Sequence, residues 1–234
     1  MRDDRWTPGG WVRPVAVWLL AGMAVAWSGC ASGGNSKKSA QDESGSMLRL
    51  AYVQLERGQI KEALASATDA VKRDPKSSEA HNFLGLIHMS QSDYPKAVTE
   101  LKEAVRLNPF FTDAHNNLGV AYREIKAYDK SLAEFQTALK DKTYKTPEKI
   151  HLNLGHLYTD QGVMTAAVQS YERAVSISPD YVLGHLALGT AYQKIGRKED
   201  ALAQFRKVVA LAPDTPEAQR AKQQMESGAG RSGS

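Results

Sequence analysis

Residues 113–138 read DAHNNLGVAYREIKAYDKSLAEFQTA. Apolar residues recur at helical spacing on both sides of a break near Ala127, which predicts two amphipathic helices joined by a short turn. Small residues, Gly119 and Ser131, stand where the two helices must touch. Similar stretches precede and follow this one. The sequence therefore predicts an all-α chain built from repeated helical hairpins.

Proline spacing gives the length of the repeat. Pro75 and Pro109 are 34 residues apart, as are Pro179 and Pro213. Alignment on these prolines yields five repeats, and the insertion DKTYKTPEK lengthens the third by two residues. The predicted repeats are residues 44–77, 78–111, 112–147, 148–181 and 182–214.

Each repeat carries small and aromatic residues at fixed places. The first helix contains Leu50-Ala51, Leu84-Gly85, Leu118-Gly119, Leu154-Gly155 or Leu188-Gly189, and the second contains Ala63, Ala97, Ser131, Ala167 or Ala201. Aromatic residues fill the space between helices at Tyr122, Tyr158, Tyr192, Phe135, Tyr171 and Phe205. This pattern over residues 44–213 resembles the tetratricopeptide repeat. The resemblance implies a right-handed solenoid of about five helix-turn-helix repeats.

The two ends of the repeat array differ. Thr215 and Pro216 suit a helix N-cap and first turn, so residues 215–226 are predicted to form a helix that caps the last repeat. Residues 227–234 are predicted to be disordered. Residues 30–46 hold no apolar residue larger than alanine beyond Cys30, and are predicted to form a flexible tether.

The N-terminus has the order of a secretory signal. Basic residues precede an uncharged apolar run at residues 15–27, which is too short to span a membrane. Ser28 and Gly29 before Cys30 resemble the lipobox of bacterial lipoproteins, which implies removal of residues 1–29 and acylation of Cys30, with palmitate among the chains. Ala31 after the cysteine implies the outer membrane, at its periplasmic face. The alternative is a plain secretory signal with an unmodified cysteine.

Composition and motifs argue against several functions. The net charge of +4 is mild and scattered, so no nucleic-acid binding is predicted. Four histidines at equivalent repeat places (His81, His115, His151 and His185) cannot converge on one metal ion, so we expect them to pack between helices. No nucleophile or phosphate-binding motif is present. The sequence predicts no enzyme, no cofactor, no metal and no small-molecule substrate.

The inner faces of the first helices are the predicted partner-binding groove. In tetratricopeptide proteins this face is free for ligands, and the resemblance transfers it here to Leu48, Tyr52, Leu55, Asn82, Leu86, Met89, Asn116 and Arg123. The groove is apolar in its first repeats, which suits an amphipathic helix or an extended peptide. The alternative is that Leu48, Tyr52 and Leu55 are covered by the tether or by tight curvature of the stack.

A lipidated tether followed by tetratricopeptide repeats is similar to the pilotin lipoproteins of type IV pilus systems. That resemblance implies a secretin subunit as partner, a lipid-mediated attachment to the outer membrane and a role in secretin assembly. A generic periplasmic scaffold for cell-envelope complexes is the second reading. A third interpretation is an enzyme whose catalytic residues the repeats conceal. No group of polar residues in the sequence is spaced so as to converge on one site, which argues against it.

Overall fold

The computed structural model describes residues 35–229, and the side chains of residues 39–227. Over this range the chain is entirely helical, which confirms the predicted fold class. The predicted signal, Cys30 and residues 230–234 lie outside the described residues. The helices within them are α1 (Asn35–Glu56), α2 (Ile60–Arg73), α3 (Ser78–Ser90), α4 (Tyr94–Leu107), α5 (Thr112–Glu124), α6 (Tyr128–Ala138), α7 (Pro147–Asp160), α8 (Met164–Ile177), α9 (Val182–Lys194), α10 (Lys198–Leu211) and α11 (Pro216–Ala229).

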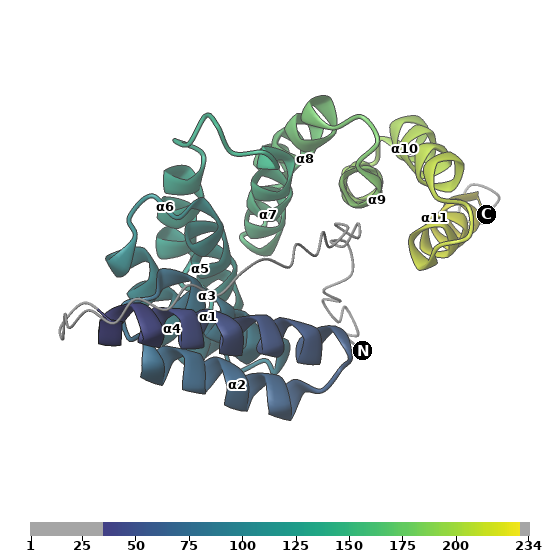
Figure 1. Ribbon diagram of the computed structural model, residues 1–234. Helices are drawn as coiled ribbons and strands as arrows, with labels where there is room; N and C mark the ends of the chain where they lie inside the picture. Colours follow the sequence, from purple (N-terminus) through teal and green to yellow (C-terminus); the bar gives the residue numbers. More distant parts are fainter. Residues whose placement is uncertain (1–34, 230–234) are drawn as a thin grey trace. The chain divides into compact units, whose positions relative to one another are not determined.

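The helices belong to two compact bodies, here called the N-terminal body (described residues 35–107) and the C-terminal body (described residues 108–229). The N-terminal body holds the hairpins α1–α2 and α3–α4 (Figure 1). The C-terminal body holds α5–α6, α7–α8 and α9–α10, with α11 packed against α9 and α10. Each body is thus a short stack of tetratricopeptide hairpins.

Close approach of the two helices in a hairpin depends on the small residue of the Leu-Gly pair. A Cβ atom on Gly119 would lie 2.6 Å from Cε1 of Phe135, and one on Gly189 would lie 2.6 Å from Cε1 of Phe205. Such distances are well inside van der Waals contact. The serine that replaces alanine in repeat 3 is also accounted for, because Ser131 Oγ donates a 2.7 Å hydrogen bond to the carbonyl of Gly119.

The turn inside each hairpin uses a left-handed residue at the same place. Gly58, Gly162 and Gly196 have φ between 72° and 81°, whereas repeats 2 and 3 place Ser92 and Lys126 there, at φ 60° and 62°. Left-handed backbone lets the chain reverse and return N–H groups to the last carbonyls of the first helix. In repeat 3, for example, the N–H of Ala127, which follows the turn, donates a 2.9 Å hydrogen bond to the carbonyl of Tyr122.

The predicted flexible tether is wrong for residues 35–46, which form the first half of α1. Ser44 is 3% exposed, and its Oγ donates a 2.8 Å hydrogen bond to the carbonyl of Ala70 on α2. Glu43 also forms an ion pair with Arg73. These polar contacts with α2 hold a segment whose composition offers almost no apolar surface.

The C-terminal cap is slightly longer than predicted. Thr215 Oγ1 accepts a 3.3 Å hydrogen bond from the N–H of Ala218, as an N-cap does, and α11 then continues to Ala229. Residues 227–229, predicted to belong to a disordered tail, are therefore helical. Ala218 and Ala221 are fully buried, whereas Gln219, Lys222 and Gln223 are exposed.

Candidate partner-binding surface

The predicted groove residues of the N-terminal body lie on α1 and α3, the first helices of their hairpins. Leu48, Leu55 and Leu86 are half-buried and pack against the hydrophobic cluster formed by Ala51, Ala63, Ala67, Phe83, Leu84 and Ile87. These leucines therefore serve the core as well as the inner face. Asn82 is buried, and Met89 is half-buried.

Tyr52 differs from its neighbours because 47% of it remains exposed. Its ring packs on the ring of Phe83, with centroids 3.8 Å apart and planes inclined by 32°. Phe83 itself is buried, so it fixes the position of the exposed tyrosine. An aromatic ring held rigidly at the surface presents contact area at a small cost in conformational entropy. Tyr52 is therefore the most exposed of the predicted groove residues in this body.

The inner face of the C-terminal body is polar and internally bonded. Asn116 on α5 accepts a 2.9 Å hydrogen bond at Oδ1 from Nδ2 of Asn153 on α7. Arg123 forms ion pairs with Glu124 and with Asp160, the latter at 3.4 Å from Nε to Oδ2, and its side chain is only 16% exposed. Arg123 therefore links α5 to α7 and is not an exposed cation for a partner carboxylate.

A buried polar network lies beside this ion pair. His156 Nδ1 is 2.9 Å from the hydroxyl of Tyr171, which is 3.2 Å from Oγ1 of Thr159. Burial lowers the pKa of His156 to about 4, with help from the positive charge of Arg123, and burial raises the pKa of Tyr171 to about 12. Both groups are thus neutral near pH 7. Gly155 makes the network possible, because any Cβ there would overlap the Tyr171 ring.

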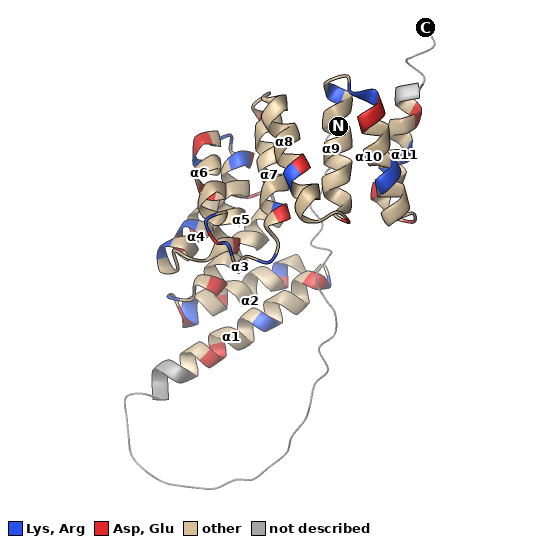
Figure 2. Cartoon of the chain, turned by 90° about the horizontal axis from the view of Figure 1, so that it is seen from above, with Lys and Arg blue, Asp and Glu red and all other residues tan. Residues whose placement is uncertain are grey.

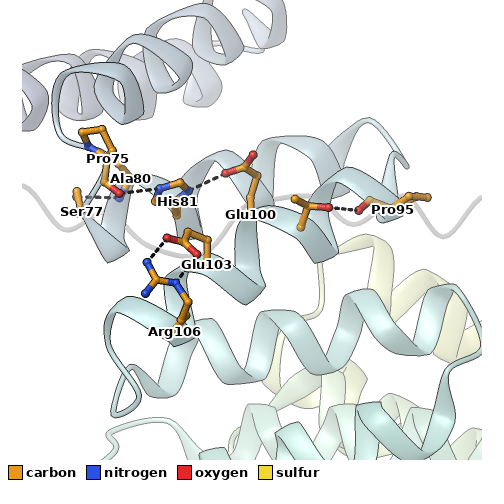
Figure 3. Close-up of polar contacts among 9 residues, drawn as sticks. Pro75, Ser77, Ala80, His81, Pro95, Glu100, Glu103 and Arg106 are labelled. Atoms are coloured by element: carbon orange, nitrogen blue, oxygen red, sulfur yellow. Dashed lines mark hydrogen bonds and ion pairs between the residues drawn. The ribbon is translucent and has the colours of Figure 1, made fainter.

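Three of the four equivalent histidines form one recurrent contact. The ring Nε2 lies against the proline carbonyl six residues earlier, and Nδ1 lies against a side chain nineteen residues later, on the second helix of the same hairpin. The pairs of distances are 3.3 and 2.7 Å for His81 (Pro75 and Glu100), 3.0 and 2.6 Å for His115 (Pro109 and Glu134), and 2.9 and 2.7 Å for His185 (Pro179 and Gln204). Figure 3 shows the first of them.

The fourth histidine, His151, lacks the matching residues. Lys145 stands where the other repeats have proline, and Ser170 stands where they have glutamate or glutamine. The insertion before α7 changes the local chain path, and Ser170 Oγ instead donates to the carbonyl of Ala166. Packing between helices is therefore confirmed for His81, His115 and His185, whereas His151 is half-buried. Among residues 35–229 no group of three or more metal-ligating side chains is assembled.

The sequence did not reveal the polar partners of these histidines. A glutamate or glutamine nineteen residues after each buried histidine was the available signal, but it appears only when the repeats are aligned. Charged side chains of both signs are otherwise interspersed along the described helices (Figure 2). None of those helices is long and apolar enough to cross a membrane.

Tetratricopeptide-repeat models match most of the array: one at residues 48–110 and 87–145, a second at 155–196 and a third at 184–215. Together they cover more than half of the chain, which belongs to the tetratricopeptide-repeat family. Proteins of this family bind other proteins and typically act as scaffolds. A curated relative, the protein O-mannosyl-transferase F38B6.6 of Caenorhabditis elegans, is 33% identical over 63 residues, but the match spans only 9% of that protein.

Two solved structures resemble the chain over most of its length. PilW, described as a widely conserved type IV pilus biogenesis factor, superposes with a TM-score of 0.70 at 23% identity, covering 79% of this chain and 92% of PilW. PilF of Pseudomonas aeruginosa gives a TM-score of 0.70 at 18% identity, covering 84% of this chain and 90% of PilF. At these identities the likeness establishes the fold.

Proposed function

We propose that the chain is a lipid-anchored pilotin: an outer-membrane scaffold that binds a secretin subunit of a type IV pilus system and assists its multimerisation. The observation that carries the proposal is the match of nearly the whole repeat array to PilW, a type IV pilus biogenesis factor. The lipobox-like Ser28-Gly29-Cys30 sequence adds support, because an acylated cysteine would hold the repeats at the periplasmic face of the outer membrane.

In this proposal the inner face of the N-terminal body contacts the secretin subunit, and Tyr52 is its exposed anchor. Leu48 and Leu55 pack against the core, so a lysine at either place would disturb folding as well as binding. Tyr52→Ala is the sharper change, because the side chain is half exposed. Leu50→Ala is the matched control: Leu50 is equally exposed on α1, at 45%, and two residues of helix place it on the opposite side.

The test measures heat-resistant secretin multimer in outer membranes of a strain that lacks this chain. Complementation with the wild type should restore the multimer, Cys30→Ala should restore less of it, and Tyr52→Ala should restore less than Leu50→Ala at equal protein level. Unchanged multimer in the deletion strain would refute the pilotin role. A defect shared equally by Tyr52→Ala and Leu50→Ala would exclude the inner face as the binding surface.

Catalysis has no place in this proposal. Among the polar networks of the described residues, the ring nitrogens of His81 and His115 are both bonded, and His156 pairs with the Tyr171 hydroxyl. None combines a nucleophile with a general base at an exposed site.

A further inference from the structure

The contacts of His81 favour the doubly protonated ring. A backbone carbonyl oxygen and an ionised carboxylate only accept hydrogen bonds. His81 places Nε2 against the carbonyl of Pro75 and Nδ1 against Oε2 of Glu100, so both ring nitrogens must donate (Figure 3). Only the imidazolium ion carries both protons. A neutral ring keeps one of the two bonds and turns a lone pair toward the other oxygen.

His115 repeats the arrangement in the C-terminal body with shorter distances. Its Nδ1 is 2.6 Å from Oε2 of Glu134 and its Nε2 is 3.0 Å from the carbonyl of Pro109. Both histidines are about one tenth exposed at the side chain, and each glutamate is about one quarter exposed. Solvent therefore screens these pairs much less than the surface pairs of the same helices.

His185 makes the same contact with an uncharged partner. Its Nδ1 faces the side-chain amide of Gln204, which can present either its oxygen or its NH₂ group after a half-turn of the amide. A neutral His185 can then donate from Nε2 to the carbonyl of Pro179 and accept from the amide at Nδ1. One chain thus holds two versions of the contact with a carboxylate and one version with an amide.

Other charges near the two rings act with different signs. Glu103 adds negative charge near His81, although it is itself bonded to Arg106 at 2.7 and 2.5 Å, and Lys140 adds positive charge near His115. The hydrogen bond that each ring donates to its glutamate is the largest influence on the pKa of the ring, ahead of burial, which opposes it. The pKa of His81 and that of His115 are both raised above 6.5.

We propose that His81 with Glu100, and His115 with Glu134, are proton-dependent clamps that tie the turn before α3 and the turn before α5 to the second helix of the following hairpin. When the ring is protonated, both hydrogen bonds of the clamp form. Loss of the proton breaks one of them. The stabilisation is complete below pH 6.5 and disappears as the pH rises through the raised pKa of each ring. Repeats 2 and 3 therefore loosen as the pH rises through the pKa of their histidines, whereas the contact in repeat 5 has no carboxylate partner. This inference does not depend on the pilotin proposal.

Three other histidines titrate in the opposite sense and must be separated from the clamps. Burial lowers the pKa of His88, His151 and His156, so each of these favours the folded state at higher pH. A pH profile of the wild type alone mixes both effects. Substitution of the glutamates isolates the clamps, because Glu100→Gln and Glu134→Gln convert them to the neutral arrangement that His185 and Gln204 already use.

The experiment compares the full repeat array of the wild type with the double variant Glu100→Gln/Glu134→Gln. Proton NMR of the ring Cε1–H signals should give titration midpoints above 6.5 for His81 and His115 in the wild type, and both midpoints should fall in the variant. Urea midpoints measured on both sides of pH 6.5 should show the variant losing its disadvantage as the pH rises. Amide exchange at residues 77–80, corrected for intrinsic rates, should accelerate with pH in the wild type alone.

The reciprocal variant, Gln204→Glu, supplies the second arm. It should raise the titration midpoint of His185 and introduce a new alkaline loosening at the turn before α9. The proposal is overturned if the midpoints of His81 and His115 are the same in the wild type and the double variant, or if Gln204→Glu leaves His185 unchanged. Fluorescence and circular dichroism establish that each variant is folded, so that a null result counts against the clamps.

Discussion

Gly155 lies so close to Tyr171 that a Cβ atom on the glycine would stand 2.3 Å from Cε1 of the ring. We therefore predict that Gly155→Ala lowers the free energy of unfolding by about 1–3 kcal/mol, the usual cost of forcing extra volume into a packed core. In repeat 1 the equivalent pair is Ala51 and Ala67, both buried without overlap. Gly155→Ala should therefore cost much less in a Tyr171→Ala background, and equal costs in a double-mutant cycle would contradict this explanation.

Leu50 and Leu84 occupy the seventh place of repeats 1 and 2, but Leu50 is 45% exposed and Leu84 is 5% exposed. Leu84→Ala should lower the free energy of unfolding by about 2–5 kcal/mol. Leu50→Ala should cost less than about 1 kcal/mol. Urea denaturation of the two variants tests this difference within one body. A large cost at Leu50 would mean that another segment covers it.

Lys126 adopts φ of 62° where three other repeats have glycine. A left-handed conformation costs a lysine roughly 1–2 kcal/mol. Replacing the lysine by glycine removes this cost, but the greater backbone entropy of glycine in the unfolded chain offsets about half of the gain. Lys126→Gly is thus expected to stabilise the C-terminal body by about 0.5–1 kcal/mol in thermal or urea unfolding. Gly162→Ala is the converse control and should destabilise. A loss of stability in Lys126→Gly would show that its side chain makes a compensating contact.

His88 has a buried Nδ1 atom with no hydrogen-bond partner, and burial is the main reason that its pKa is lowered. A lowered pKa means that the unfolded chain binds the proton more readily, so the stabilisation present above pH 6.5 is lost as the pH falls. His88→Phe removes this titration and keeps a ring at the same place. The urea midpoint of His88→Phe should gain on that of the wild type as the pH is lowered below 6.5. A constant difference across the range would exclude His88 as the source.

Ser44 tests the finding that residues 35–46 belong to α1. Ser44→Ala removes the buried hydrogen bond to the Ala70 carbonyl and should cost about 1 kcal/mol. Ser46→Ala is the matched control, because the hydrogen bond of Ser46 to the Asp42 carbonyl is exposed, and its cost should be close to zero. Amide hydrogen exchange of residues 40–46 should be slower than that of an unstructured peptide. Exchange at the rate of an unstructured peptide would mean that residues 40–46 form a flexible tether and not part of α1.

The hairpins could be predicted because the information that specifies them is local and repeated. The Leu-Gly pairs mark where two helices touch, and Gly119 and Phe135 are in contact as the spacing required. The start of α1 could not be read in the same way. Its stability comes from a serine hydroxyl and an ion pair with α2, 26 and 30 residues away in the sequence. Composition carries no record of such distant polar contacts.

The helical period predicts that Leu48, Tyr52 and Leu55 share one side of α1, but it does not predict how exposed each of them is. Which of them remains open depends on the neighbouring helix, and only Tyr52 is left half exposed while the two leucines pack inward. Arg123 was similarly unpredictable, because its ion pair partner Asp160 belongs to the next hairpin.

The two terminal helices have unequal capacity for extension. α1 retains Leu50 and Val53 at places that later repeats bury completely, as with Leu118 and Leu157, whereas α11 has covered its apolar side and turned glutamine and lysine outward. An additional hairpin grafted in front of α1 could pack against these exposed apolar residues. One grafted behind α11 would first require several glutamine and lysine residues to be replaced by apolar ones. The described surfaces therefore favour engineered lengthening of this array at its N-terminal end.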